Sequence, residues 1–565
     1  MSDLTTPHAP NGDPSAAPSN TSTDEQTTQP APIASSGAAW FAGAIGAAVA
    51  LGIGEVADRF SESLTSLVIG VGNLFVQLTP GDVVATSINT IGALQKPLLI
   101  SGIILGSIAV GGWLAIRSRR SPWPVIAGFA IFGLLGGVAT ARDELTSAPG
   151  SFAVAALAAV IGAATTLALL RAAAKPTDSA MPASGVVMPG TPLSKATNRR
   201  RMLAYGGAAT GAVALAGVGR IGRTSAAERA REQLIAESAA TTVPNAAETT
   251  TTTAAPSASF DNIEGITSYI TPISPEDEFY LIDTALVKPQ VDPATWSLTI
   301  EGPHVTTPVT YTYDELLARD MVTKEVTLSC VSNPVGGNLV GNAVWTGIPL
   351  TELLDEAGLI DPTNDQTQIF TRSVDGFTCG FPVPLAYDGR TAMLALKMNG
   401  EPLPIAHGFP ARLVIAGLYG YVSATKWIDR IAITDWIGVD GYWMPRGWSK
   451  EGPVKTQSRI DVPRQGETVS AGPTTIAGIA WSPTLGIDKV EISIGDDDVW
   501  QEAELAVVES NETWVQWKYD WDAPAGQHVV RVRATDGTGF TQSPLPVAPA
   551  PNGAEGYHTV TVRVA

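Results

Sequence analysis

The pattern of apolar and polar positions changes twice along the chain. Long apolar runs fill the first third, mixed helix and strand patterns follow, and short alternating runs fill the last fifth. Crossing the hydrocarbon core of a bilayer takes roughly 20 apolar residues, so we predict an all-α transmembrane segment of about five helices over residues 38–175. The second run carries polar residues at intervals, which also suits a helix lying on the membrane surface. The runs cover residues 38–54, 63–79, 97–116, 123–140 and 151–172.

Basic residues orient these helices. RSRR at 117–120 follows the third run, and a loop ending in the three arginines 199–201 follows the fifth. Lysine and arginine favour the cytoplasmic side of a membrane. A sixth apolar run, within 198–220, begins with paired arginines, Met and Leu, which is typical of a twin-arginine export signal; a basic flank on a last transmembrane helix is the alternative. Residues 176–222 are therefore predicted to be a cytoplasmic loop and a twin-arginine-like sixth helix, and both interpretations place the later chain outside the cytoplasm.

Sequences of low complexity flank the helical part. Residues 1–37 are rich in Pro, Ser, Thr and Asn and carry acidic residues but no Lys or Arg, which predicts a disordered acidic tail. Residues 223–258 contain a short helical pattern and then a Thr/Ala/Pro-rich stretch without core-forming side chains. We predict that they form a linker.

Two further domains are expected after the linker. Residues 259–447 interleave strand patterns such as EVTLSC with short helical patterns such as YDELLAR, which predicts an α+β domain. Residues 448–565 consist of alternating runs such as KVEISI and HVVRVRATD, separated by turn residues. This spacing predicts an all-β sandwich of immunoglobulin-like class. Its tryptophans are interpreted as packing residues, with a carbohydrate-binding platform as the alternative.

Composition and charge exclude several functions. The net charge of −19 argues against nucleic-acid binding, which needs clustered Lys and Arg. Two cysteines are too few for a disulfide-rich scaffold or a four-thiolate zinc site. The five histidines avoid the apolar runs and no CxxCH motif occurs, so no haem is expected in this chain. A redox role would therefore require a separate electron carrier, such as a cytochrome or a quinone-linked protein.

One cysteine occupies an unusual local pattern. Cys330 closes the apolar strand pattern 326–329 and precedes the glycine-containing turn SNPVGG. Glycines there let the backbone approach a bulky group. The thiol is a core residue, half of a disulfide with Cys379, or a metal ligand, and its immediate surroundings leave the three alternatives open.

Three longer stretches carry a family resemblance. TLSCVSNPVGGNLVGNAVWTGIPL, LKMNGEPLPIAHGFPARLVIAGLYGYVSATKW and GPVKTQSRID follow one another in order between residue 327 and residue 461. Together they resemble the sulfite oxidase family of molybdopterin enzymes: its cysteine-bearing strand, its MNG-x-PL…HGFP-x-R signature with a later KW, and the entry into its C-terminal immunoglobulin-like dimerisation domain. The resemblance runs from about residue 265 to the end of the chain.

The resemblance implies a site, a cofactor and partners. Cys330 is expected to bind molybdenum, since a soft thiolate is a good ligand for that metal. A molybdopterin cofactor, a small-molecule substrate and a homodimer through the C-terminal domain are also implied. The residues expected to hold the pterin and its phosphate are His407, Arg412, Ala424, Thr425 and Lys426, with Tyr280, Asp283 and Ser373 as weaker matches.

The substrate pocket departs from the family pattern. Sulfite oxidases of animals and plants carry one substrate-binding arginine where this chain has Ile282, and another after the cysteine in a C-x-x-N-R-R pattern, where Asn333 is here followed by Pro334 and Val335. Their active-site tyrosine aligns near Phe377. A pocket that lacks these cations binds a dianion poorly, and family members that reduce methionine sulfoxide have neutral substrates. Arg372, Arg390 and Arg446 are the remaining nearby cations.

We therefore predict a multi-pass protein of the cell membrane whose extracytoplasmic molybdenum domain transfers an oxygen atom to or from a small sulfur compound, a sulfoxide or a sulfite-like anion. The first alternative is a non-catalytic, membrane-tethered binding protein with a degenerate molybdopterin fold. The second is a transporter or sensor in which the helices themselves act. Charged residues between the first two apolar runs suit that second alternative and a solvated loop equally well.

Overall fold

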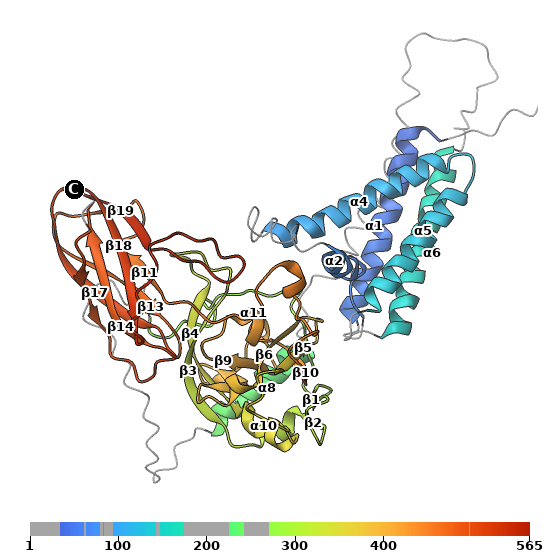
Figure 1. Ribbon diagram of the computed structural model, residues 1–565. Helices are drawn as coiled ribbons and strands as arrows, with labels where there is room; N and C mark the ends of the chain where they lie inside the picture. The colour runs from blue at the N-terminus through green and yellow to red at the C-terminus, as the bar shows by residue number, and fades with distance from the viewer. Residues whose placement is uncertain are drawn as a thin grey trace, which may run out of the picture.

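A computed structural model describes residues 34–60, 64–79, 83, 94–142, 147–174, 225–241, 271–495 and 498–565. A helical bundle and two β-rich domains make up these residues (Figure 1). The bundle helices are α1 (Ser36–Phe60), α2 (Leu67–Leu78), α4 (Gln95–Arg117), α5 (Trp123–Thr140) and α6 (Ala148–Ala174).

Four helices of the bundle are long and apolar enough to cross a membrane, namely α1, α4, α5 and α6. Small residues let them approach closely: a Cβ atom built on Gly43 of α1 would lie 2.0 Å from the carbonyl oxygen of Gly111 of α4. The second apolar run forms α2, whose 12 residues are fewer than a span requires. The sixth run, with its paired arginines, lies outside the described residues.

Helix α8 (Ala226–Thr241) occupies part of the predicted linker. Ala227 is fully buried in the core of the first β-rich domain. Arg231 donates hydrogen bonds to the carbonyls of Pro402 and Leu403, both at 3.1 Å. The structure therefore adds this helix to the domain that was expected to begin at residue 259.

The first β-rich domain contains two sheets. One has the strand order β2-β1-β10-β5-β6, and the other has the order β3-β4-β7-β8 with β9 paired to β7. Only β1 and β10 pair in parallel among these described strands. The strands are β1 (Ser297–Glu301), β2 (Val309–Thr312), β3 (Val322–Ser329), β4 (Val340–Pro349), β5 (Thr367–Ser373), β6 (Thr378–Pro382), β7 (Ala392–Met398), β8 (Glu401–Pro402), β9 (Arg412–Ile415) and β10 (Ile428–Asp435).

Short helices complete this domain: α9 (Tyr313–Leu317), α10 (Leu350–Glu356) and α11 (Gly420–Ser423). The start of α9 is a capping box, in which Thr312 accepts from the Glu315 amide and the Glu315 carboxylate accepts from the Thr312 amide. Large side chains from both sheets, including Trp345, Phe409 and Trp427, fill one core. The domain predicted to be α+β is thus β-rich with short helices, and candidate site residues stand where its strands begin and end.

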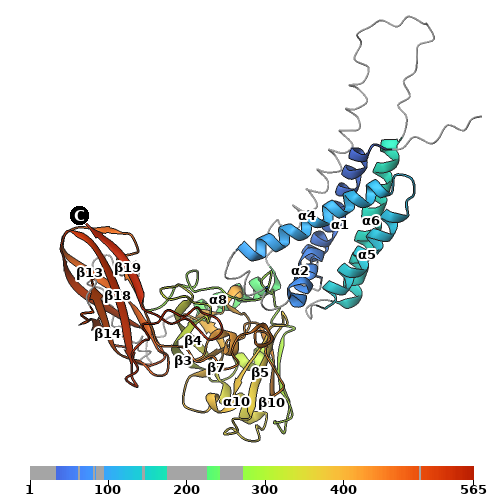
Figure 2. The same cartoon turned by 45° about the horizontal axis from the view of Figure 1, so that its top comes forward.

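The C-terminal domain, coloured orange to red, is made of β-strands (Figure 2). It contains a sheet ordered β11-β13-β17-β16 and a sheet ordered β12-β19-β18-β14-β15. Both sheets contribute to one apolar core that includes Trp517 and Trp521. Their strands are β11 (Gln457–Val462), β12 (Thr468–Val469), β13 (Gly472–Trp481), β14 (Ile487–Ile494), β15 (Gln501–Glu502), β16 (Glu504–Leu505), β17 (Val515–Ala523), β18 (Gly526–Asp536) and β19 (His558–Val564).

Candidate functional site

Cys330 follows the last residue of β3 and is 7% exposed. Its amide donates to the carbonyl of Leu339 at 2.9 Å, and its own carbonyl accepts from the amide of Asn333 at 3.0 Å. Cys330 and Cys379 are both free thiols, so the structure does not form the disulfide that was one alternative. Burial raises the pKa of the Cys330 thiol, and hydrogen bonds from Ser332 offset part of that rise.

The turn after Cys330 rests on the C-terminal domain. Gly336 has φ +72°, and a Cβ atom there would lie 2.2 Å from the His558 ring. Arg459 donates from Nη1 to the carbonyl of Gly337 at 2.8 Å. Burial, assisted by the nearby Arg459 cation, lowers the pKa of His558 to about 4. The position of Cys330 therefore depends on contacts between the two β-rich domains.

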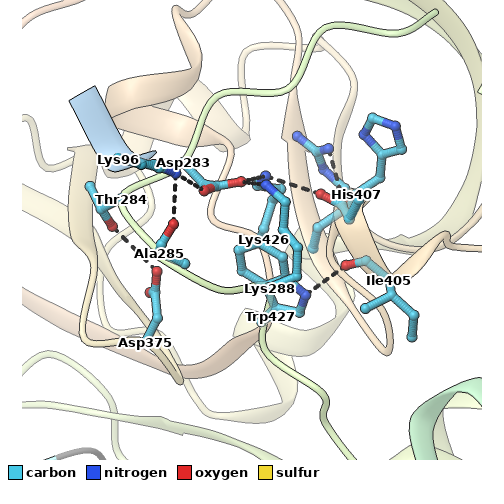
Figure 3. Close-up of polar contacts among 12 residues, drawn as sticks. Lys96, Asp283, Thr284, Ala285, Lys288, Asp375, Ile405, His407, Lys426 and Trp427 are labelled. Atoms are coloured by element: carbon cyan, nitrogen blue, oxygen red, sulfur yellow. Dashed lines mark hydrogen bonds and ion pairs between the residues drawn. The ribbon is translucent and has the colours of Figure 1, made fainter. Parts of the chain in front are cut away.

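A buried carboxylate organises a cluster of lysines (Figure 3). The Asp283 side chain is 4% exposed and receives Lys426 at 2.8 Å and Lys96 at 2.9 Å, and Lys288 also contacts it. Burial alone would raise the pKa of Asp283, but the ammonium groups of Lys426, Lys96 and Lys288 hold that pKa well below its ordinary value. Three cations on one carboxylate leave an excess of positive charge.

Lys426 and Arg412 are the most deeply buried cations of this region. Burial lowers the pKa of Lys426 to about 8, against the attraction of Asp283. Arg412 is 4% exposed and its guanidinium lies 4.8 Å from the centre of the Trp345 ring. It donates to the carbonyl of His407 at 3.2 Å, and no carboxylate pairs with it among the described residues. Burial lowers its pKa to about 10.

His407 is held as a neutral side chain. Its Nε2 atom lies 3.0 Å from the carbonyl oxygen of Glu276, so this nitrogen carries the proton when the ring is neutral. Burial, and then the Arg412 cation, lower the pKa of His407 to about 4. Gly408, at φ +114°, brings the backbone against both Arg412 and Lys426, which a side chain at that position would prevent.

Tyr280 connects this cluster with Cys330. Burial raises its pKa, the Cys330 thiolate would raise it further and Arg412 lowers it, so the phenol lies within electrostatic reach of both groups. A Cβ atom built on Gly420 would lie 3.7 Å from the Tyr280 hydroxyl, 3.5 Å from the Cβ atom of Ala424 and 3.9 Å from the carbonyl oxygen of Ser329. Tyr280 and Ala424 therefore both approach Gly420, which lies near the residue that precedes Cys330.

Two of the predicted residues point elsewhere. The Thr425 hydroxyl contacts Thr371 at 2.6 Å and the Cys379 sulfur at 3.0 Å. Ser373 accepts from the amide of Asp375 at 3.4 Å inside a turn. That turn reaches the Asp283 segment because Thr284 donates to Asp375 at 3.3 Å. Thr425 and Ser373 therefore contact the protein groups that surround the site and do not line the site itself.

Three residues of the site were not predicted. Lys96 and Lys288 reach Asp283 from a membrane helix and from a loop, and no motif signals either of them. Asn333 accepts from the Leu339 amide at 2.9 Å, while its buried Nδ2 atom has no hydrogen-bond partner within the described ranges. The one feature of the sequence that points to Asn333 is its position three residues after Cys330.

The described residues offer no metal site built from three or more protein side chains. No group of three or more His, Cys, Asp or Glu side chains could hold a metal ion within the described part of the chain. A metal at Cys330 would therefore take its other ligands from a cofactor. The unpaired Arg412 cation and the unsatisfied Asn333 amide both suit a polar, anionic group beside that thiol.

Residues 285–443 match the family model described as oxidoreductase molybdopterin binding domain. This domain is similar to sulfite oxidases as well. The mitochondrial sulfite oxidase of Macaca fascicularis is 30% identical over 350 residues, covering 53% of this chain and 62% of that protein. The enzyme of Homo sapiens is 29% identical over 330 residues, covering 50% and 58%. The chain spans about three fifths of the length of these relatives.

Among solved structures, the sulfane dehydrogenase SoxCD of Paracoccus pantotrophus aligns with 53% of this chain and 85% of its own chain, at 22% identity and a TM-score of 0.44. The match to a molybdopterin-binding domain and the similarity to sulfite oxidases imply a molybdenum cofactor for this domain. The free Cys330 thiol, the unpaired Arg412 and the excess lysine charge fit such a cofactor.

Proposed function

We propose that the protein is a membrane-anchored, extracytoplasmic molybdenum-cofactor oxidoreductase that performs two-electron oxygen-atom transfer on a small sulfur compound. The observation that carries the proposal is the buried, unpaired guanidinium of Arg412. A buried charge without a counter-ion costs several kcal/mol, so a fold that keeps one, with Tyr280 within electrostatic reach of both this charge and the free Cys330 thiol, is suited to an anionic cofactor.

Each residue of the cluster has a proposed task. Cys330 would bind molybdenum through its sulfur and lose its proton on binding, which offsets the cost of its burial. Arg412, Lys426 and the neutral His407 would hold the pterin and its phosphate, as the family resemblance implies. When it is bound, such a cofactor supplies the two-electron redox chemistry.

The substrate class follows from the remaining cations. Arg372 pairs with Asp429 at 3.0 Å and Arg390 pairs with Asp388 at 2.7 Å. Arg446 has no carboxylate partner among the described residues, and its buried Nε atom has no acceptor. Its guanidinium lies 3.8 Å from the centre of the Tyr442 ring. Because Arg446 is the one arginine of these three without a carboxylate partner among the described residues, we propose a neutral sulfoxide rather than a dianion such as sulfite as the substrate.

Either direction of the reaction needs an electron partner. Reduction of a sulfoxide consumes two electrons and two protons and yields a sulfide and water. Oxidation of sulfite takes its oxygen from water and releases two electrons and two protons. We propose a separate cytochrome or quinone-linked protein as the carrier, because the sequence has no haem-attachment motif and no histidine in its apolar runs.

The contact between helix α4 and the molybdopterin-binding domain supports the extracytoplasmic location. The domain contacts Lys96 in the first turn of α4, whereas the basic residues Arg117, Arg119 and Arg120 stand at the opposite end. Since basic flanks favour the cytoplasm, the domain would lie on the other side. By the family resemblance, the C-terminal domain is proposed to be an immunoglobulin-like dimerisation module.

The test compares two buried cysteines in the full chain, purified from a host that makes the cofactor. Cys330→Ser is expected to abolish turnover of sulfoxide or sulfite, with a smaller loss of molybdenum because the pterin contributes its own ligands. Cys379→Ser is the matched control, since a serine hydroxyl can keep the contacts with Thr371 and Thr425. Wild-type protein that takes up no molybdenum would instead support the non-catalytic binding protein.

A further inference from the structure

The segment that carries Tyr280 and Asp283 is held by a membrane helix. Lys96, in the first turn of α4, places its ammonium group 2.9 Å from Asp283 and 2.6 Å from the carbonyl oxygen of Ala285 (Figure 3). One lysine therefore binds a side chain and a main-chain carbonyl two residues apart. This fixes both the position of the carboxylate and the path of the backbone.

A second, apolar contact joins the same segment to the bundle. Leu286 packs against Gly72 of α2, where a Cβ atom would lie 2.5 Å from the Leu286 Cδ1 atom and 3.4 Å from the Ile103 Cδ1 atom of α4. The contact is possible because residue 72 is glycine. Residues 283–286 thus contact two neighbouring helices, α4 through hydrogen bonds from Lys96 and α2 through apolar packing against Gly72.

The surface of the segment is unusually apolar for a loop. Leu281, Ile282 and Val287 are 46%, 49% and 56% exposed. In both overall views α4 extends from the bundle toward the molybdopterin-binding domain (Figures 1 and 2). Exposed apolar side chains on both sides of Asp283 suit a position beside lipid-facing helices better than a free surface in water.

We propose that Lys96 is a positioning residue of the cofactor site, so that helix α4 completes a site otherwise built by the molybdopterin-binding domain. Lys96 holds Asp283, and Asp283 in turn holds Lys426 at 2.8 Å. Without Lys96, the Asp283 segment loses its link to the helix, and Lys426 loses a fixed counter-ion. This inference rests on the proposed function for the cofactor, whereas the docking contact itself does not.

The docking contact is tested in the full chain with Gly72→Cys and Leu286→Cys together and a protease site engineered at residues 222–224. Mild oxidation is expected to join the two cysteines, so that the helical and β-rich fragments stay covalently linked after cleavage. The chain with Gly72→Cys alone is the control and should separate into two fragments. Separation of the double variant as well would overturn the docking.

The positioning role is tested by molybdenum retention during prolonged dialysis of the full chain. Lys96→Met is expected to release molybdenum roughly tenfold faster than wild type, as removal of an outer partner of a bound group commonly does. Lys96→Arg keeps the charge and should retain most of the metal. Lys324→Met removes an exposed lysine of β3 and should match wild type.

Equal retention in Lys96→Met and Lys324→Met would overturn the positioning role, even if the engineered cysteines join. If wild-type protein holds no molybdenum, the proposed function fails, and the disulfide experiment still decides whether α4 docks on the segment. Failure of the inference and failure of the proposed function therefore give different results.

Discussion

At the scale of single residues, the charged side chains of the site lower the stability of the fold when no ligand is bound. Three lysines share the carboxylate of Asp283, and Arg412 is buried with only carbonyl acceptors and the face of Trp345. Desolvation of a charge is compensated only by a close opposite charge or several good hydrogen bonds. This excess of positive charge is the property that an anionic cofactor would relieve.

Substitution of Arg412 separates cofactor binding from folding. Arg412→Met removes the charge and keeps much of the volume against Trp345, so the cofactor-free chain should unfold at the same temperature or a slightly higher one. Cofactor affinity should fall about 10-fold to 100-fold, the range for loss of a charged hydrogen bond. Thermal unfolding and molybdenum analysis on the same preparations measure both effects.

A second arginine provides the contrast. Arg372 donates to Asp429 in a half-buried ion pair, so Arg372→Met leaves a carboxylate without its partner. This variant should lose stability and keep its molybdenum. If Arg412→Met destabilised the cofactor-free chain as much as Arg372→Met, then Arg412 would be a structural residue rather than a ligand for an anion.

At the scale of elements, the site was predictable where it depends on local sequence. Cys330 stands at the end of β3 and Arg412 at the start of β9, and both stand in stretches long enough to show the family resemblance. Lys96 was not predictable, because it meets Asp283 across 187 residues and such a pairing leaves no local pattern. The same limit applies to α8, whose packing on the domain is a tertiary contact.

Helix length and domain boundaries were also only partly predictable. The apolar run at 63–79 has the composition of a membrane helix, yet the helix in that run covers only Leu67–Leu78. Ser66 caps its start by accepting from the Val68 amide at 3.2 Å, and α2 ends before Thr79. Apolar composition therefore identified the run but did not determine how much of it is helical.

The turn after Cys330 gives a prediction at this scale. Gly336→Ala places a methyl group against His558 at a positive φ, whereas Gly389→Ala has a positive φ of 94° with open space around it. Backbone strain alone should cost Gly389→Ala roughly 1–2 kcal/mol, and overpacking should cost Gly336→Ala about 1–3 kcal/mol more. Thermal unfolding in detergent, followed by tryptophan fluorescence, measures the difference.

Cofactor binding distinguishes the two glycine variants further. Gly336→Ala should also weaken molybdenum retention, because the turn that it distorts begins at Cys330. Gly389→Ala should bind the metal as wild type does. If both variants lost the same stability and the same metal, the contact between the turn and the C-terminal domain would have no special role in the site.

At the scale of the whole molecule, three parts of the chain converge on one site. The bundle supplies Lys96, the central domain supplies Cys330 and Arg412, and the C-terminal domain supports the cysteine turn through Arg459 and His558. A change at any of the three contacts should therefore alter cofactor retention. The helical bundle and the C-terminal domain thus contribute contacts to the candidate site as well as forming separate modules.

The buried His407 and the partly buried His558 make the stability of this arrangement dependent on pH. His407 and His558 have pKa values lowered to about 4, so between pH 6.5 and 4 the unfolded chain binds protons that the folded chain excludes. Stability should therefore fall as the pH falls through this window, by at most roughly 3 kcal/mol for His407. The unfolding temperature in detergent, measured from pH 7 to pH 4.5, should decrease steadily.

His558→Gln, whose amide oxygen can accept from the Ile460 amide as Nδ1 does at 2.9 Å, should reduce this decrease. His528→Gln should not, because that ring contacts the carbonyl of Pro524 near the surface. An unfolding temperature that is constant across the window would show that neither histidine is kept neutral by the fold.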